Sequence, residues 1–201
     1  MRNQGQRDIV LAALVVLVVA SLLAAYQYRR QAGHWSADGS IYARLTLENR
    51  GLSRAEALRE VDAFMLQTTD AVNPESRGFY GNAPPAHFVR QFSLFRGRPL
   101  FPALAAPLVP RFGLDALRVV SAIAGVVGAL AAFALLLAVA PPWVAALGAI
   151  GFAAAPPVRD LTAAPLTDAL ALAAWCAILA ATVHATRSSS RTTAFGLAAF
   201  A

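Results

Sequence analysis

An acid and a tyrosine lie about a dozen residues after the first apolar run, in the sequence Asp38-Gly39-Ser40-Ile41-Tyr42. A carboxylate in a cleft at a membrane surface stands in a low dielectric. This environment disfavours the charged form and suits the group to take a proton from a substrate. Asp38 is therefore a candidate catalytic base, and Tyr42 is a candidate substrate-binding residue. The alternative is an Asp-Gly turn in a loop, without a chemical role.

Two arginines precede an apolar stretch that is broken by prolines, in the sequence RGRPLFP at positions 96–102. A guanidinium group binds phosphate oxygens through two parallel hydrogen bonds. Arg96 and Arg98 are therefore candidates for binding an anionic head group. The alternative is that both side chains only extend from the apolar stretch toward water at the membrane surface.

A third polar group falls between positions 156 and 170, where Arg159, Asp160 and Asp168 stand close together in the sequence. Asp168 comes just inside the boundary of an apolar run, where acids are costly and often functional. It is a second catalytic candidate, and Arg159 and Asp160 are candidates for substrate binding. The alternative for Asp168 is an N-cap or first-turn acid that complements a helix dipole.

Other kinds of site have little support in the sequence. The histidines His34, His87 and His184 are scattered, and no His/Cys spacing resembles a metal site. There is no glycine-rich phosphate loop. We therefore expect no metal and no cofactor. Nucleic-acid binding is also not expected, although the net charge is +6, because the arginines are spread over both faces of what is predicted to be a membrane protein.

The elements that position these residues follow from composition. Of the 201 residues, 58% are hydrophobic and 14% are charged, and all 17 basic residues are arginine. Soluble domains average about 25% charged residues, so a soluble enzyme is disfavoured. Uncharged runs extend over positions 9–28, 119–158 and 169–186, and about 20 apolar residues span a bilayer as a helix. The single cysteine, Cys176, lies in the last of these runs.

These runs predict an all-α fold, a polytopic bundle of transmembrane helices. The spans are expected at about 9–26, 114–140, 143–155 and 166–183, and 194–201 would begin an incomplete fifth run. Two Pro-Pro pairs end the second and third spans, because proline lacks the amide donor and clashes with the preceding turn. Residues 158–167 are expected to form a short polar connection. The incomplete fifth run suggests that the chain is the N-terminal part of a longer protein.

A large outer loop, residues 27–113, is expected to carry amphipathic helices. Ser53-Arg54-Ala55-Glu56 is a capping box and predicts a helix over about 54–66 that lies against the membrane or the spans. Residues 73–85 are expected to form an irregular loop. The prolines at 99, 102, 107 and 110 should break the following stretch into short turns or an interfacial helix.

The orientation is predicted from the arginines in short loops. Arg2 and Arg7 precede the first span, and Arg187 and Arg191 follow the fourth. If both groups are cytoplasmic, the spans alternate consistently. We therefore expect a multi-pass protein of the cell membrane with a cytoplasmic N-terminus and an extracytoplasmic loop 27–113.

This layout resembles the membrane-embedded glycosyltransferases of the C superfamily, which include protein mannosyltransferases and aminoarabinose transferases. The resemblance rests on the first span, on DGSIYAR at 38–44, on RGRPLFPALAAPL at 96–108 and on PPVRDLTAAPLTDALALAAW at 156–175. It covers most of the chain through short, loose motifs. Many relatives have a second acid directly after the first, where this chain has Gly39. The family usually has many more spans.

The resemblance implies transfer of a sugar from a polyprenyl-phosphate carrier to an acceptor on the outer face, with the lipid tail between the spans. Asp38 would take or orient the acceptor proton, and Asp168 or Asp160 would complete the site. Arg98, with Arg96 or Arg159, would hold the leaving phosphate. The implied partners are a lipid-linked sugar donor and membrane lipid, and the acceptor stays open.

Two other classes of function are compatible with the same residues. In a transporter fragment, the acids and arginines would line a substrate path. In a non-catalytic membrane scaffold or assembly protein, the polar loop would bind a partner. The structured outer loop favours the transferase over the transporter, because transporters place their sites near the midplane between broken helices.

Overall fold

The computed structural model describes residues 2–30, 35, 37–69 and 98–188. Every regular element in this part of the chain is a helix, which confirms the predicted all-α fold. The chain divides into two compact units, each with its own core. Unit 1 consists of Met1–Gln27, Ala122–Thr162 and Asp168–Ala201, and unit 2 consists of Tyr28–Ser121 and Ala163–Thr167.

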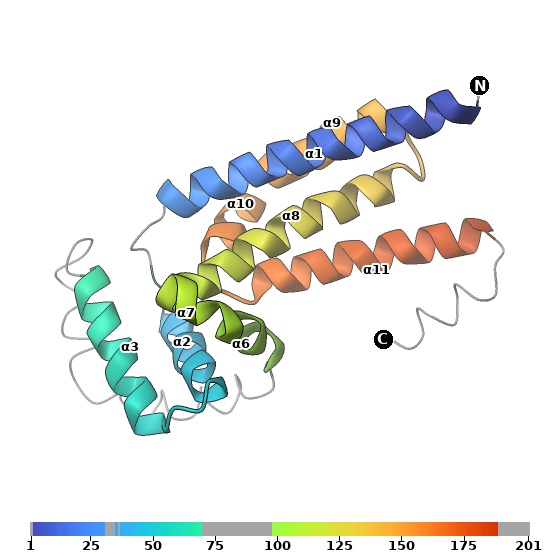
Figure 1. Ribbon diagram of the computed structural model, residues 1–201. Coiled ribbons are helices and arrows are strands. Elements are labelled where there is room, and N and C mark those ends of the chain that lie inside the picture. Colours follow the sequence, from blue (N-terminus) through green and yellow to red (C-terminus); the bar gives the residue numbers. More distant parts are fainter. Residues whose placement is uncertain (1, 31–34, 36, 70–97, 189–201) are drawn as a thin grey trace. The chain divides into compact units, whose positions relative to one another are not determined.

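Unit 1 contains the long apolar helices (Figure 1). They are α1 (Arg2–Arg30), α8 (Ala116–Leu136), α9 (Pro142–Ala154), α10 (Pro156–Ala163) and α11 (Asp168–Ser188). The last residues of α1, the first residues of α8 and the last residue of α10 belong to unit 2. Three segments are long and apolar enough to cross a membrane: Gln4–Arg30, Leu100–Leu136 and Asp168–Arg187. The described part of the chain therefore has the character of a membrane protein.

The third expected span differs from the prediction. Helix α9 has 13 residues, which reach only about 20 Å at 1.5 Å per residue and cannot cross a hydrocarbon core of about 30 Å alone. Helix α10 follows directly, and the two are bent by 62°, as in a broken span or a re-entrant loop. The expected polar connection at 158–167 is wrong for most of its length, because Pro156 and Pro157 begin a helix, a position where the missing amide costs nothing.

The ends of the other predicted spans lie closer to the helix ends in the structure. Helix α11 begins at Asp168, close to the predicted start at 166. Helix α8 ends at Leu136, and residues 137–140 form turns before Pro141 and Pro142 begin α9. The expected incomplete run at 194–201 lies outside the described residues.

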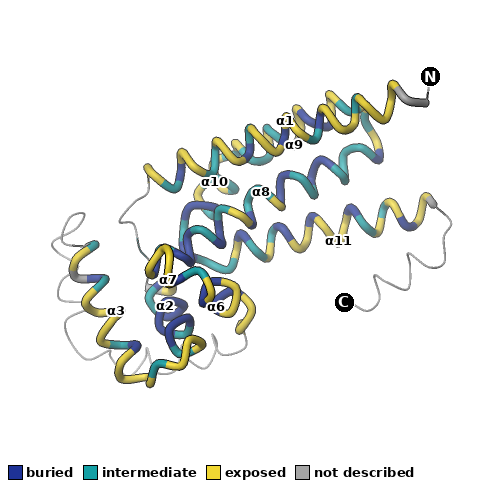
Figure 2. The backbone as a smooth tube through the Cα atoms, in the orientation of Figure 1, coloured by how far each residue is buried: buried dark blue, intermediate teal, exposed yellow. Residues whose placement is uncertain are grey.

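The core of unit 1 is made largely of small side chains. Seven of the nine buried residues in its main cluster are alanines, and they come from α1, α8 and α9. Large apolar side chains of the same helices point outward, among them Leu22, Val144 and Leu147. Figure 2 shows α1 with far more exposed than buried positions. Small residues let helix backbones approach closely, as is typical of helix packing within lipid.

Unit 2 contains shorter helices: α2 (Ala37–Asn49), α3 (Arg54–Thr69), α6 (Leu100–Ala105) and α7 (Val109–Phe112). Two single 3₁₀ turns, Ala106–Leu108 and Gly113–Asp115, interrupt the proline-rich stretch. Gly113 has a φ of 59°, a left-handed conformation that favours glycine. The predicted breaking of this stretch into short turns is therefore confirmed.

Helix α3 begins where the capping box predicts. The Ser53 amide donates to the Glu56 carboxylate at 2.9 Å, and the Glu56 amide donates to the Ser53 hydroxyl at 3.3 Å. The apolar side chains Ala57, Val61 and Met65 are buried, and α3 packs against α2. The helix predicted over about 54–66 is thus confirmed. The expected packing of its apolar face against the membrane or the spans is wrong, because this face packs against α2 instead. The loop expected at 73–85 lies outside the described residues.

Candidate functional site

Three stretches that are far apart in the sequence meet at the hydroxyl group of Tyr42, within unit 2. The Tyr42 Oη lies 3.2 Å from Thr167 Oγ1, and either atom can be the donor. Arg98 Nη1 donates to the same Tyr42 Oη over a long distance of 3.5 Å. The structure therefore brings together two predicted substrate-binding residues, Tyr42 and Arg98, and adds Thr167 from the third stretch.

The packing around Tyr42 fixes its ring. Tyr42 is only 1% exposed, and its ring meets Phe101 of α6 edge-on, with 5.3 Å between the ring centroids. The Thr46 hydroxyl donates to the Tyr42 carbonyl oxygen at 2.7 Å. A buried aromatic ring with a bonded hydroxyl has little freedom, so Tyr42 presents its oxygen in one position between Arg98 and Thr167.

Asp38 stands one helical turn before Tyr42, in the first turn of α2, and its side chain is exposed. The alternative of a loop turn at Asp38-Gly39 is wrong, because both residues are helical. Residues four apart lie on the same side of a helix, so Asp38 and Tyr42 share one side of α2. A negative charge in the first turn also complements the helix dipole.

The remaining predicted acids belong to unit 1. Asp168 opens α11 and is exposed. On α10, Arg159 Nε donates to Asp160 Oδ1 at 3.4 Å in an exposed pair of neighbours. Because Asp38 lies in unit 2, its predicted approach to Asp168 or Asp160 stays a prediction.

Arg96, His34 and His87 lie outside the described residues. Among the residues that the structure describes, no group of three or more His, Cys, Asp or Glu side chains could hold a metal ion. His184 is described and has a structural contact, because its Nε2 lies 2.8 Å from the Ala134 carbonyl oxygen near the end of α8.

Two buried arginines in unit 2 escaped the sequence analysis. Arg118 is 2% exposed, and its guanidinium stands 4.4 Å from the centroid of the Tyr28 ring. It also donates to the Tyr28 carbonyl oxygen and, at 3.3 Å, to Asp115. Arg44 is buried on α2, with its Nε 3.3 Å from the Glu48 carboxylate. Arg118 stands between Leu117 and Val119, and an arginine in such an apolar context was the available signal.

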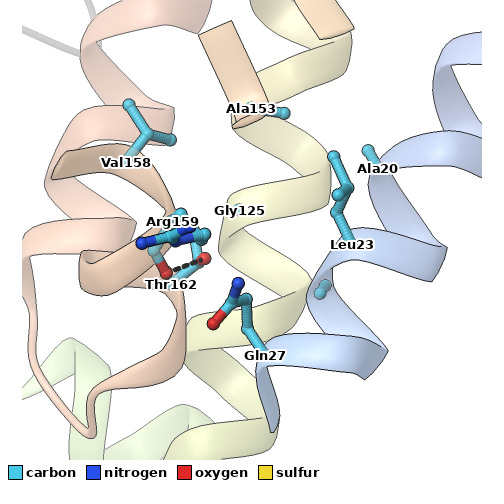
Figure 3. A pocket seen from close by; sticks show the side chains of 9 residues that line it. Ala20, Leu23, Gln27, Gly125, Ala153, Val158, Arg159 and Thr162 are labelled. Atoms are coloured by element: carbon cyan, nitrogen blue, oxygen red, sulfur yellow. Dashed lines mark hydrogen bonds between the residues drawn. The ribbon is translucent and has the colours of Figure 1, made fainter. Parts of the chain in front are cut away.

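A small pocket in unit 1 was also missed (Figure 3). It is lined by Ala20, Leu23, Ala24, Gln27, Gly125, Ala153, Val158, Arg159 and Thr162. The Thr162 hydroxyl donates to the Arg159 carbonyl oxygen at 2.9 Å. Neutral polar residues such as Gln27 and Thr162 carry no motif, so only the fold identifies them.

Comparison with protein-family models, with curated proteins and with solved structures gives no match. The described residues themselves define a helical protein with candidate membrane spans and a polar cluster at Tyr42.

Proposed function

We propose that the protein is a glycosyltransferase that moves a sugar from a polyprenyl-phosphate donor to an acceptor at the membrane surface. The observation that carries this proposal is the cluster of Arg98, Tyr42 and Thr167, with the exposed carboxylate of Asp38 one turn away on α2. It combines a cation and hydroxyl groups with a carboxylate that is free to meet an acceptor. A phosphate leaving group requires a cation to stabilise its charge, and an acceptor hydroxyl requires a carboxylate to take its proton.

In this mechanism Asp38 takes the proton of the acceptor hydroxyl as the acceptor oxygen forms its bond to the anomeric carbon. The bond between that carbon and the phosphate oxygen breaks, and its electron pair leaves with the phosphate. Arg98 stabilises the negative charge that develops there, and Tyr42 orients Arg98. Asp168, Asp160, Arg159 and Arg96 stay candidates for completing the site. The reaction would take place on the extracytoplasmic face of the cell membrane.

Sugar transfer in proteoliposomes tests this proposal, with a labelled polyprenyl-phosphate sugar as donor. Asp38→Asn keeps the size of the side chain but removes the base, so transfer should fall about 10²–10⁴-fold while donor binding is retained. Arg98→Ala removes a phosphate partner, so donor binding and turnover should both fall. Asp62→Asn on α3 is the matched control and should transfer at the wild-type rate. Wild-type transfer by Asp38→Asn would overturn the mechanism.

A transporter is the second candidate, because α9 and α10 form a bent helix pair with a small, largely apolar pocket beside it. Broken helices often line substrate sites in transporters. However, the pocket includes Gln27, within one turn of Arg29 and Arg30 at the polar end of α1, whereas transporter sites lie near the midplane. Uptake of labelled sugars into vesicles without transfer would favour this alternative.

A further inference from the structure

The proline-rich stretch of unit 2, which contains α6 and α7, has two sides of opposite kind. Its inner side is buried, and Phe101 there packs against Tyr42 of α2. Its outer side is exposed although it is largely apolar, and Figure 2 shows exposed and buried positions alternating along this stretch. Most of the exposed positions recur at helical spacing, so they form one outward face. This α6–α7 face consists of Leu100, Ala103, Leu104, Pro107, Pro110, Arg111 and Phe112.

A membrane span does not need this stretch. The apolar segment that could cross a membrane runs from Leu100 to Leu136 and has 37 residues, or about 55 Å at 1.5 Å per residue. The hydrocarbon core of a bilayer is only about 30 Å thick. The 21 residues of α8 alone reach about 32 Å at the same rise. The residues before α8 can therefore lie along the surface of a bilayer.

Prolines limit how deep this stretch can lie. Pro102, Pro107 and Pro110 each lack the amide that would donate to a carbonyl one turn earlier. A carbonyl without a donor is costly in hydrocarbon, whereas water satisfies it at the membrane surface. At the level of the head groups, apolar side chains meet the acyl chains while the backbone stays hydrated. The stretch is therefore suited to that level.

The charges of the α6–α7 face complement an anionic surface. Arg98 and Arg111 flank the face, and no acid lies between them. The exposed Arg111 guanidinium stands 5.6 Å from the centroid of the Phe112 ring, a pairing of cation and aromatic ring that suits a membrane interface. The exposed side of α3 in the same unit carries charges of both signs: Arg54, Glu56, Arg59, Glu60 and Asp62. The α3 side therefore suits water, and the α6–α7 face suits anionic lipid.

We propose that the α6–α7 face lies on the membrane surface and binds anionic phospholipid head groups. Leu100, Leu104 and Phe112, which are 59%, 42% and 39% exposed, insert between the head groups. Arg111 donates to their phosphate oxygens. A second copy of the chain fits this face poorly, because a symmetric contact would place arginine against arginine with no acid to pair them. The lipid contact does not depend on sugar transfer.

Spin labelling of the full chain in lipid nanodiscs tests the proposal. In a Cys176→Ala background, the nitroxide is attached at Leu104→Cys or, as the matched control, at Ala63→Cys on the exposed side of α3. Collisions with oxygen, which concentrates in lipid, and with a water-soluble nickel complex report the depth of each label. In phosphatidylglycerol discs, oxygen collisions should prevail at position 104 and nickel collisions at position 63. Equal nickel accessibility at the two positions would overturn the proposal.

The role of charge is tested with the same label at position 104. Arg111→Gln should raise its nickel collision rate about fivefold in phosphatidylglycerol discs, the Boltzmann factor of one arginine near an anionic surface. Arg59→Gln on the exposed side of α3 is the control and should change nothing. Phosphatidylcholine discs should give the wild type a similar rise, as should about 1 M salt, which shortens the Debye length to about 3 Å.

Two results would contradict the anionic lipid as partner. One is a wild-type label at position 104 that lies equally deep in phosphatidylglycerol and phosphatidylcholine. The other is dipolar broadening of that label that disappears when unlabelled protein is mixed in before reconstitution, which would assign the face to a second copy of the chain.

Discussion

The two units achieve burial in opposite ways. In unit 1 the buried positions are mostly alanine, and leucine, valine and tryptophan face outward. In unit 2 the largest buried side chains include Tyr42, Phe101, Leu47, Met65 and the arginine Arg118. Unit 2 thus resembles the interior of a water-soluble domain, and unit 1 resembles a bundle of helices in lipid, where close backbone approach replaces bulk.

The difference indicates where polar chemistry can be positioned. In unit 2, buried hydroxyl and guanidinium groups are held among large side chains, as with Tyr42 against Phe101 and Arg118 over Tyr28. In unit 1, the polar contacts gather near helix ends, as with Gln27 in its pocket and Arg187, which donates to the Ala138 carbonyl oxygen. Unit 1 should therefore be sensitive to added volume, and unit 2 to lost volume.

The largest loss of stability is expected when a large buried side chain of unit 2 is shortened. Phe101 is 1% exposed and packs against Tyr42, so Phe101→Ala should lower the free energy of unfolding of unit 2 by about 3–5 kcal/mol. Leu100→Ala, at a position that is 59% exposed, is the control and should cost less than about 0.5 kcal/mol. Hydrogen exchange of α2 and α6 amides in the full chain measures both. Equal effects of the two variants would contradict a core of large side chains.

The next largest loss of stability is expected when a small residue in the core of unit 1 is enlarged. In Gly125→Ala the new Cβ would lie 2.3 Å from Thr162 Cγ2 and 2.9 Å from Thr162 Cβ, so α10 must shift. Overpacking of this kind costs about 1–3 kcal/mol. In Gly128→Ala the nearest atom, Ala173 Cα, lies at 3.5 Å, an ordinary contact, so this control should be neutral or stabilising. Melting temperatures in detergent compare the two, and a tolerated Gly125→Ala would disprove the close approach of α8 and α10.

Local signals predicted where two of the helices, α3 and α11, begin. The Ser53–Glu56 capping box and the acid at position 168 mark where α3 and α11 begin, because both depend on hydrogen bonds or charge within one turn. Helix α10 was missed because its Pro-Pro pair was interpreted as a break, although proline is equally suited to the first turn. Helix α2 was missed because buried residues lie around nearly its whole circumference, which removes the periodicity of an amphipathic helix.

The residues of the candidate sites also divide into those that sequence indicates and those that only the tertiary structure reveals. Tyr42 and Arg98 were chosen for their chemistry, but their meeting at one hydroxyl depends on tertiary structure. Thr167 and Gln27 have common side chains that no spacing rule identifies, and their roles follow only from what lies beside them. Sequence chemistry therefore picked out Tyr42 and Arg98 but not the buried Arg44 and Arg118, and the structure added the neutral Thr167 and Gln27.

The smallest effect concerns pH and is expected in unit 2, on α3. Hydrogen bonds from the Ser53 side chain and then its backbone hold the pKa of Glu56 below its ordinary value. A lowered folded pKa means that this carboxylate stabilises α3 fully above its unfolded pKa, near 4.3, and that the contribution is lost as pH falls through the folded pKa. Burial raises the pKa of Asp62 on the same helix, so its contribution has the opposite sign: it favours the fold at low pH and is lost as pH rises.

Hydrogen exchange of the α3 amides between about pH 3 and 6, corrected for intrinsic rates, separates these two groups. Glu56→Gln should remove the loss of protection at low pH, because the amide oxygen still accepts from the Ser53 amide but does not titrate there. Asp62→Asn should make that loss steeper, because the opposing group is gone. The amides of α8 should show no such dependence in either variant, since neither carboxylate lies on that helix. If α8 and α3 lose protection together, α3 unfolds only with the rest of the chain. The two units would then not unfold independently, as their separate cores suggest they do.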